Sequence, residues 1–378
     1  MQFTSLNFTC SSCGAPQRFS PTESSLICDF CHTKKAIEID NTPIKEYNFQ
    51  EALRTLNTEE NKEIQKEVLC KKCGGHFQFT PYTFSSLCPF CQTPATIERI
   101  QEIQPQSLIP FQISQQEALS IFKEWVGSRW FAPDAFKKYL DTEEKLLGYY
   151  LPYWTYDSQT NTSYQGLRGD IYYVTVRKRI RDTNGNLREV NVQEARINWT
   201  PVSGEVTLSF DDITVGASKT ITRAILESLE PWDTNQLLPF NEKYLAGFEA
   251  QEYTIGLDNG FEYAKVKMAS SIQRAIKGQI GGDQQKITTS HTHYSQVSYK
   301  NTLFPIWTAT FEWKEKSYLY AINAQTGKIV GERPYSYVKI TLAIVALLAT
   351  LALGGYLYNT YAPKELPSHS YTTTPLYP

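Results

Sequence analysis

The sequence predicts an α+β fold class, in which a mainly antiparallel, β-rich body follows two small cysteine-bearing modules and precedes one C-terminal apolar helix. Three observations lead to this prediction. All eight cysteines stand in Cys-x-x-Cys pairs within the first 91 residues, and from Gly148 onward Tyr, Val, Thr and Trp alternate with turn residues. The run at 340–357 is apolar and contains no charged residue. The formal net charge of -2 gives no overall attraction to nucleic acid or to an anionic membrane.

The cysteines form a repeat, because two Cys-x-x-Cys pairs at 10–13 and 28–31 return with identical spacing at 70–73 and 88–91. Two residues between cysteines let one tight turn present both sulfurs to the same ion, and four thiolates in a tetrahedron favour zinc. Iron or an iron–sulfur centre is the alternative for this ligand set. We therefore expect two zinc ribbons and two zinc ions. The predicted metal ligands are Cys10, Cys13, Cys28, Cys31, Cys70, Cys73, Cys88 and Cys91.

Pairing of the cysteines within each copy is favoured, although pairing of the outer with the inner pairs is topologically possible. A metal with four sulfur ligands keeps no open position for water, so the predicted role is structural. His32 and His76 stand beside ligand pairs and are expected to be exposed or outside the ligand set. His291 and His293 are two apart on a predicted strand and so face one side. They form either half of another metal site or part of an ordinary polar face.

The predicted organisation along the chain follows composition and local signals. It comprises zinc ribbon 1 at 1–42, a helical spacer or linker at 43–66, zinc ribbon 2 at 67–100, the α+β body at 101–337, a transmembrane helix at 338–358 and a disordered tail at 359–378.

Within the body, Ser114 and Glu117 form a capping box before a helix that extends to Val126, and a short helix follows Pro133. The dipeptide Asn184-Gly185 predicts a hairpin between strands at 171–181 and 187–199. Further strands are expected at 202–215, 286–299, 303–313 and 317–324, with helices at 219–229 and 259–278.

Arginines alternate along the first strand of this hairpin, at Arg177, Arg179 and Arg181, and Arg188 and Arg196 stand on the second. We expect one basic sheet face. It is either a solvated face balanced by acids or a contact surface for anionic lipid head groups or nucleic acid. The balancing acids are Asp182, Glu189 and Glu194.

The apolar run at 340–357 is long enough to cross a membrane, because a helix of this length covers roughly 27 Å. Tyr356, Tyr358 and Tyr361 stand where an interfacial aromatic belt is expected. More basic residues precede the run than follow it, so the positive-inside rule places the N-terminal bulk in the cytoplasm and the short tail outside. A single-pass membrane protein with a reducing cytoplasmic part is predicted, which also keeps the thiols available for metal.

Enzyme signatures are missing from the sequence, so a non-enzyme is predicted. The segment 216–220 lacks the leading glycine and the spacing of a phosphate loop, and no cysteine lies outside the ribbons. The ribbons also lack a basic stripe. Residues 1–40 hold three basic against four acidic residues. With four thiolates on zinc, the first ribbon carries a formal charge of about -3, and the second comes to roughly zero on the same basis.

Several segments resemble a family of bacterial, membrane-anchored, tandem zinc-ribbon proteins. Members are labelled as TFIIB-type zinc-ribbon proteins or as "primosomal protein N′/superfamily II helicase". The similar segments are Tyr-Tyr-Leu-Pro-Tyr-Trp-Thr-Tyr-Asp at 149–157, Trp-Thr-Pro-Val-Ser-Gly at 199–204, Gly-Gly-Asp at 281–283, Ile-Asn-Ala-Gln-Thr-Gly at 322–327 and Gly-Glu-Arg-Pro-Tyr at 331–335. The resemblance implies a partnership with flotillin-like (SPFH-domain) membrane scaffolds.

The expected function is that of a non-enzymatic adaptor, anchored in the bilayer through 340–357, which recruits or scaffolds protein partners at the cytoplasmic face of the membrane. The alternative is a membrane-tethered nucleic-acid-binding protein that uses the ribbons or the arginine strand. The weak charge of the ribbons disfavours this alternative.

Overall fold

The structure, a computed structural model, describes residues 2–4, 8–38, 40, 42–56, 67–70, 76–78, 83–89, 93–96, 105–130, 133, 146–181, 187–313, 316–332 and 335–361. The chain divides into two compact units. The first comprises Met1–Phe122, Lys145–Thr310 and Leu319–Gly331, and the second comprises Lys123–Glu144, Phe311–Tyr318 and Glu332–Pro378.

The elements of the N-terminal part are short. They are β1 (Gln2–Thr4), β2 (Gln17–Ser20), β3 (Ser25–Cys28), β4 (Lys34–Ala36), β5 (Tyr47–Asn48), α1 (Phe49–Leu56), β6 (Glu67–Leu69), β7 (His76–Gln78), β8 (Thr83–Leu87), β9 (Pro94–Thr96) and β10 (Ser107–Leu108). The later elements are α2 (Gln115–Gly127), β11 (Leu147–Arg181), β12 (Leu187–Gly216), α4 (Arg223–Ser228), the 3-10 helix η1 (Thr234–Gln236), β13 (Leu238–Pro239), the 3-10 helix η2 (Glu242–Leu245), β14 (Glu249–Gln251), α5 (Leu257–Ile280), β15 (Gln284–Trp313), β16 (Lys316–Asn323), β17 (Ile329–Gly331) and α6 (Tyr337–Tyr361).

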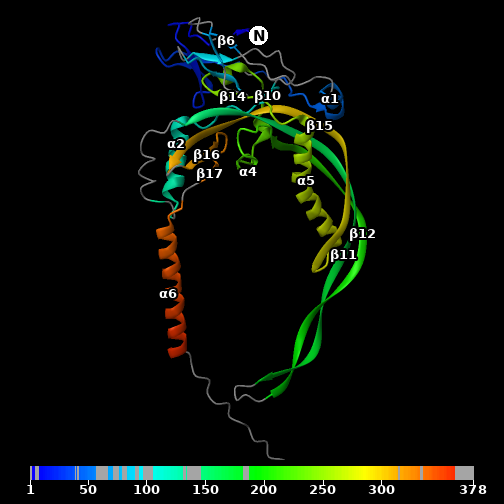
Figure 1. Cartoon of the computed structure of the whole chain (residues 1–378). Coiled ribbons are helices and arrows are strands. Elements are labelled where there is room, and N and C mark those ends of the chain that lie inside the picture. Colours follow the sequence, from blue (N-terminus) through cyan, green and yellow to red (C-terminus); the bar gives the residue numbers. More distant parts are fainter. Residues whose placement is uncertain are drawn as a thin grey trace, which may run out of the picture. The chain divides into compact units, whose positions relative to one another are not determined.

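The body is built on β11, which pairs antiparallel with β12 on one side and with β15 on the other (Figure 1). Short parallel pairings of β10 with β15 and of β14 with β11 extend this sheet. The predicted α+β class with a mainly antiparallel body is therefore confirmed. The hairpin of β11 and β12 is also confirmed, although its turn residues, Asn184 and Gly185, lie outside the described part of the chain.

The body strands are longer than the sequence predicted. We expected a break between 187–199 and 202–215, but β12 is one strand of 30 residues. The likewise separate strands at 286–299 and 303–313 are both parts of β15. Pro201 lies in the expected break, and proline ends a central strand but is tolerated on an edge strand. Among the described residues, β12 pairs with β11 alone, and so Pro201 stands on an edge strand.

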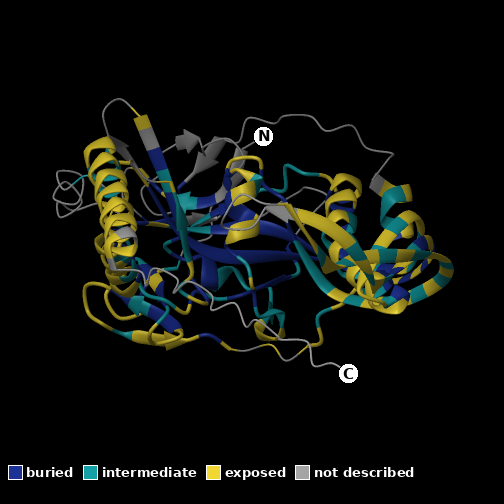
Figure 2. Cartoon of the chain, turned by 90° about the horizontal axis from the view of Figure 1, so that it is seen from below, coloured by how far each residue is buried: buried dark blue, intermediate teal, exposed yellow. Residues whose placement is uncertain are grey.

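Buried residues gather along the central strands (Figure 2). Two hydrophobic clusters lie on the two faces of the first part of β11. Trp154 and Tyr156 point into one hydrophobic cluster together with α5. Leu151 and Tyr153 point into a second cluster together with α4. Because alternate residues of a strand face opposite sides, a strand covered by a helix on each face needs a continuous apolar run. This requirement explains the aromatic segment at 149–157.

The helix α5 packs one apolar face against the first cluster. The buried residues of this face recur at intervals of four, which places them on one side of the helix. These residues are Ala264, Met268, Ile272, Ile276 and Ile280. The helix was predicted at 259–278, and the structure extends it by two residues at each end. Gly281 and Gly282 follow with φ of 64° and 74°, a conformation that favours glycine.

Two other helix predictions have different outcomes. The capping box before α2 is confirmed, because both the backbone N–H and the hydroxyl of Ser114 donate to Glu117 at 2.8 Å. The helix expected at 219–229 begins only at Arg223. The hydroxyls of Ser218 and Thr220 instead donate to Gln251, at 2.8 and 2.5 Å, which holds the preceding segment in a turn. The helix expected after Pro133 lies outside the described residues.

The segment predicted as a helical spacer contains the helix α1, but the first half of this segment packs against the body. Phe49 is buried, and its ring lies 4.7 Å from that of Phe261 in α5. β5 pairs antiparallel with β15. The predicted linker at 43–66 therefore includes residues that belong to the core of the first unit.

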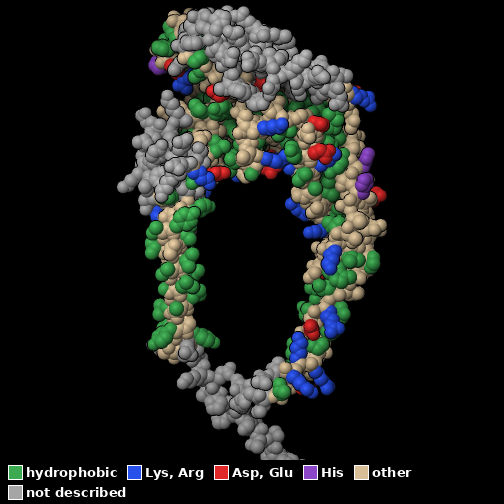
Figure 3. Space-filling view, viewed as in Figure 1, with side chains coloured by type: hydrophobic (Ala, Val, Ile, Leu, Met, Phe, Trp, Pro, Cys, Tyr) green, Lys and Arg blue, Asp and Glu red, His purple; other side chains and the backbone are tan. Residues whose placement is uncertain are grey.

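The second unit contains α6, whose residues Tyr337–Tyr358 are long and apolar enough to cross a membrane, and none of that stretch is buried in the structure. This agrees with the predicted position at 338–358. Its exposed side chains are aliphatic or aromatic almost throughout (Figure 3). In water such a surface would be strongly unfavourable, whereas in a bilayer it meets hydrocarbon. Most of the tail predicted at 359–378 lies outside the described residues.

Candidate metal centre

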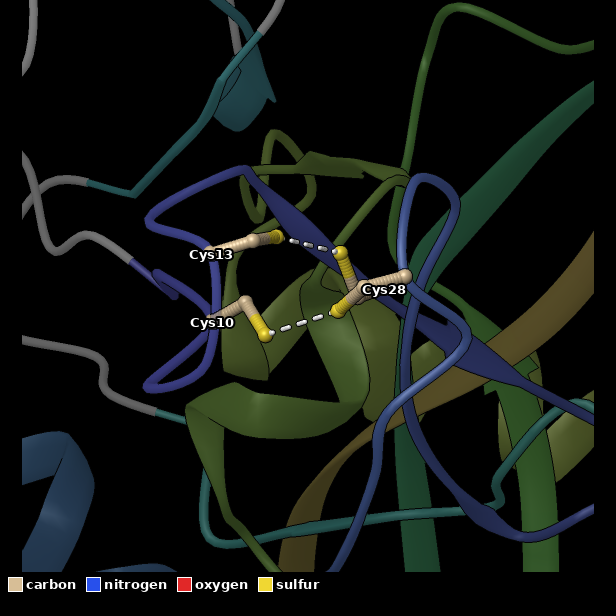
Figure 4. A group of neighbouring side chains, drawn as sticks. Cys10, Cys13 and Cys28 are labelled. Carbon is tan, nitrogen blue, oxygen red and sulfur yellow. Dashed lines mark hydrogen bonds between the residues drawn. The ribbon is translucent and has the colours of Figure 1, made fainter.

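The four cysteines of the first copy come together in one group (Figure 4). The Sγ atoms of Cys10 and Cys31 are 3.5 Å apart, and so are those of Cys13 and Cys28. All four sulfurs lie within 4.8 Å of one another. In a tetrahedral site with Zn–S bonds of about 2.3 Å, sulfurs are roughly 3.8 Å apart. The group therefore has the chemistry and the spacing to hold one metal ion, with pairing inside the copy.

Two backbone turns present the sulfurs. Gly14 has φ of 72°, and its N–H donates to the carbonyl of Cys10 at 2.8 Å. In the second turn His32 has φ of 57°, and its N–H donates to the carbonyl of Cys28 at 2.9 Å. Histidine thus occupies the left-handed position that glycine occupies in the first turn, and His32 is exposed outside the sulfur group. This agrees with the expected exposed imidazole outside the sulfur group.

Hydrogen bonds to two sulfurs favour their thiolate forms. The backbone N–H of Ser12 donates to Cys10 at 3.4 Å and lowers the pKa of that thiol. The hydroxyl of Thr33, 3.1 Å from Cys31 Sγ, and the Thr33 backbone lower the pKa of Cys31 to about 6. These are the partners that orient a thiolate toward a metal.

The crowding of the sulfurs has the opposite effect on Cys13. The backbone N–H of Ala15 acts to lower the pKa of Cys13, but the nearby thiols of Cys31 and Cys28 outweigh it and raise the pKa to about 12. Four thiolates at this spacing repel one another, so a divalent cation is needed to stabilise all four charges.

The second copy repeats the strand pair and the turn around the third cysteine of the first copy. In β3–β4 the register pairs Ser25 with Ala36, and in β8–β9 it pairs Ser85 with Thr96. The two residues of the second pair follow those of the first at the same sequence distance as Cys88 follows Cys28. The turn after the strand also repeats: Cys88 N donates to the Thr93 carbonyl at 2.9 Å, as Cys28 N does to the Thr33 carbonyl at 3.1 Å. The strand pair and the turn at Cys28 are therefore repeated in the structure at Cys88.

Two predicted ligands of the second copy are described, Cys70 and Cys88, and they are 1% and 0% exposed, like Cys10 and Cys28 at 3% and 0%. Cys73 and Cys91 lie outside the described residues. The described cysteines are free thiols rather than disulfides.

Both ribbons pack against one segment of the body, residues 244–251, here called the docking segment. From the first ribbon, Phe19 N donates to the Ala246 carbonyl at 2.9 Å, and the Phe19 ring lies edge-on to Tyr244 at 5.1 Å. From the second ribbon, β8 pairs with β14, and the Ser85 hydroxyl donates to the Phe248 carbonyl at 3.2 Å. The cysteine modules are therefore integrated into the first unit, which sequence patterns did not indicate.

We expect the substitution Gly247→Ala to weaken this contact. Gly247 has φ of 93°, and an added Cβ would lie 3.1 Å from Arg18 Cβ. The strain of a left-handed alanine predicts a loss of roughly 1–2 kcal/mol in the free energy of unfolding. Urea unfolding of the full chain in detergent measures it. The matched control is Gly127→Ala, where no atom lies within 4 Å. Equal stability of the two variants would contradict the prediction.

The other histidines make no cluster in the part of the chain that the structure describes. His291 and His293 lie exposed on β15, opposite Ser163 and Asn161 of β11, and belong to none of the possible metal-binding groups there. His76 begins β7, and its side chain is not among those described.

The predicted single basic face is wrong. In the register of the hairpin, Arg179 lies opposite Glu189, whereas Arg188 lies opposite Ile180 and Arg196 lies opposite Tyr172. Residues of one parity share a face, and so Arg188 and Arg196 point away from the face of the three alternating arginines. Basic residues therefore stand on both faces of the hairpin.

A second group of possible ligands consists of Asp157, Asp211 and Asp212, whose carboxylates lie within 4.8 Å of one another. Lys300 Nζ lies 2.7 Å from Asp212 and 3.1 Å from Glu46. An ammonium group therefore supplies the positive charge here, and we assign no metal to this group.

Comparisons with known proteins add one relative. The chain is 26% identical, over 239 residues, to "Uncharacterized protein YdjG" of Bacillus subtilis (strain 168). The similarity covers 63% of this chain and 66% of that protein, so the chain matches just under two thirds of its relative. No family model matches the chain. No solved structure matches it either.

Proposed function

We propose that the chain is a membrane-anchored zinc-ribbon adaptor that recruits or scaffolds protein partners at the cytoplasmic face of a membrane. The observation that carries the proposal is the first ribbon itself: four sulfurs converge on one point, and an aromatic side chain is presented beside them. Phe30 stands between Cys28 and Cys31 and is 75% exposed. Zinc bound by Cys10, Cys13, Cys28 and Cys31 would fix this turn and leave no position for a substrate.

The anchor in this proposal is α6. Its apolar surface, none of which is buried, supports insertion in a bilayer, and Lys328 and Lys339 on its N-terminal side support a cytoplasmic location for the preceding chain. By the sequence resemblance given above, the partner would be a flotillin-like membrane scaffold. The ribbons resemble those of the same family, and we propose that the second copy holds a second zinc through Cys70, Cys73, Cys88 and Cys91.

Binding of nucleic acid by the ribbons is the weaker candidate. Two of the three basic side chains of the first ribbon are already held by its own acids: Arg18 lies 2.6 Å from Asp29, and Lys34 lies 2.7 Å from Glu23. A surface that follows phosphates needs basic groups free for contact. This local pairing favours a protein partner.

The substitution Phe30→Ala tests the adaptor function. An exposed aromatic anchor of an interface contributes about 2 kcal/mol when truncated to alanine, so crosslinking to the scaffold in native membranes is expected to fall at least tenfold. Zinc content should not change, since Phe30 supplies no metal ligand. The matched control is Val266→Ala on α5, where the side chain is 71% exposed. Unchanged crosslinking in Phe30→Ala, or no scaffold captured by the native chain, would contradict the proposal.

A further inference from the structure

The far end of the β11–β12 hairpin is a two-stranded ribbon that lies beyond the rest of the sheet (Figure 1). β15 accompanies β11 only as far as Gly169, which lies opposite Gln284. Beyond Asp170↔Asn198, eleven residue pairs of the hairpin remain, from Ile171↔Ile197 to Arg181↔Leu187. At about 3.3 Å per residue, this segment is about 36 Å long. Residues 171–181 and 187–197 are here called the basic arm.

A turn at 281–283 leads from α5 into β15 and sets the point at which β15 begins to pair with β11. Asp283 N donates to the Gly169 carbonyl at 2.9 Å, and the Asp283 carboxylate accepts the Ile171 N–H at 2.7 Å. Gly281 and Gly282, both with positive φ, bring α5 into this turn. The segment Gly-Gly-Asp at 281–283 thus fixes the residue at which the arm leaves the sheet. Hydrogen bonds from Asp283 hold the start of the arm in place.

Charge is concentrated on the arm. It carries six basic residues against two acidic ones, a formal charge of +4 in a chain whose net charge is -2. The basic residues are Arg177, Lys178, Arg179, Arg181, Arg188 and Arg196. Figure 3 shows Lys and Arg side chains gathered at the distal end of the hairpin. As they stand on both faces, the arm presents positive charge whichever face meets a surface.

Apolar side chains accompany the charges. Tyr172, Tyr173 and Leu187 are 46%, 66% and 68% exposed. On the face of Lys178 the neighbours are valines, with Val176 opposite Val192. A bare two-stranded hairpin is at best marginally stable in water, so the exposed side chains of Tyr172, Tyr173 and Val192 indicate a covering surface. Tyrosine beside Lys and Arg is the composition of segments at a membrane–water interface.

We propose that the basic arm binds anionic lipid head groups of the bilayer that α6 enters. The inference rests on the proposed membrane anchoring, which keeps the arm at high effective concentration near a membrane surface. Each Lys or Arg close to an anionic leaflet strengthens binding roughly fivefold. Nucleic acid would satisfy the charges, but it would leave the tyrosines and valines without an apolar partner. The lipid interface accommodates both.

Hydrogen exchange of the full chain in lipid nanodiscs tests the proposal. Amides of the arm should exchange at least fivefold more slowly in discs that mix phosphatidylglycerol with phosphatidylcholine than in pure phosphatidylcholine discs, and 0.5 M NaCl should remove most of the difference. A variant with Lys178→Gln, Arg188→Gln and Arg196→Gln should lose the protection. The matched control, Arg274→Gln with Lys277→Gln on the exposed side of α5, should retain it.

The outcomes separate the alternatives. Equal exchange of the arm in both kinds of disc overturns the proposal. Protection by a DNA or RNA duplex in neutral discs, without an effect of anionic lipid, assigns the arm to nucleic acid and overturns it too. Protection that rises with protein concentration in neutral discs, again without an effect of anionic lipid, assigns the arm to a second copy and equally overturns it. Failure of the chain to enter discs at all overturns the membrane anchoring on which the inference rests, and is scored separately by co-elution with lipid.

Discussion

Replacing Cys28 with serine is expected to remove one metal ion from the chain and to unfold the first ribbon while the body stays folded. The ribbon has little else to stabilise it. Its strands β2, β3 and β4 have only four, four and three residues, and its buried apolar side chains outside the cysteines are few, with Phe19 and Leu26 the largest. Structural zinc contributes about 10–16 kcal/mol in zinc-finger peptides, so the metal is expected to dominate the stability of this module.

Elemental analysis and hydrogen exchange together measure the effect. Protein purified without oxygen should hold about two zinc ions per chain, and Cys28→Ser or Cys88→Ser about one, because each four-cysteine set binds one ion. Amides of β2 and β3 should lose protection in Cys28→Ser. The matched control is Ser12→Ala, which keeps the backbone N–H that donates to Cys10. A native chain without metal, or a Cys28→Ser variant that retains two ions, would contradict the prediction.

The body should survive this loss, because its cores do not depend on the ribbon. Trp154 and Tyr156 pack with α5, and Leu151 and Tyr153 pack with α4. The contact that would be lost is the one between Phe19 and the docking segment. Chelator treatment of the native chain should therefore expose the ribbon to proteolysis and leave the long strands protected.

Local patterns sufficed to predict the cysteine modules and several helix boundaries. The spacing within each Cys-x-x-Cys pair lets both sulfurs face one ion, and the spacing between pairs favours pairing inside each copy. The capping box at Ser114 and the glycines after Ile280 are likewise local devices, whose effect depends on neighbours in the sequence. The docking of both ribbons on 244–251 joins residues that are far apart in the chain, and no local signal encodes it.

The length of the strands could not be predicted from the sequence, because some residues that usually end a strand are present for packing between strands. Gly169 suggests a strand end, yet it lies opposite Trp199, and a Cβ there would approach the indole to 2.8 Å. The glycine therefore makes room for a cross-strand tryptophan. The register of the hairpin could not be predicted either, because it depends on turn residues and on long pairing. Without it, Arg188 and Arg196 could not be assigned to the face opposite Arg179.

The substitution Lys300→Met is expected to lower the free energy of unfolding by about 3 kcal/mol or more at pH 8, because removing one member of a buried ion pair leaves charges without compensation. The Lys300 side chain is 8% exposed, and its ammonium group contacts Asp212 and Glu46. Methionine preserves the length and the apolar stem of the side chain. The loss therefore measures the charge rather than the packing.

The stability loss of Lys300→Met is expected to depend on pH, because Asp157 titrates close to Lys300. Burial raises the pKa of Asp157 from 3.8 to about 6, although the Asp212 N–H and the Lys300 charge oppose the shift. The folded state thus binds more protons than the unfolded state between about pH 4 and 6, so this group's contribution to stability falls as pH rises through that window. Without the ammonium group the pKa of Asp157 rises further. The deficit of Lys300→Met should consequently grow from pH 5 to pH 8.

Urea unfolding in detergent at pH 5, 6.5 and 8, followed by tryptophan fluorescence, measures the effect. The matched control is Lys277→Met on the exposed side of α5, where a change within about 0.5 kcal/mol is expected. Adding Asp157→Asn to Lys300→Met should recover part of the loss at pH 8, because one uncompensated charge disappears, and the double-mutant cycle isolates that coupling. A deficit that is equal at all three pH values, or no recovery in the double variant, would show that Lys300 acts through packing. The ammonium group would then not be what stabilises the junction of β5, β11, β12 and β15.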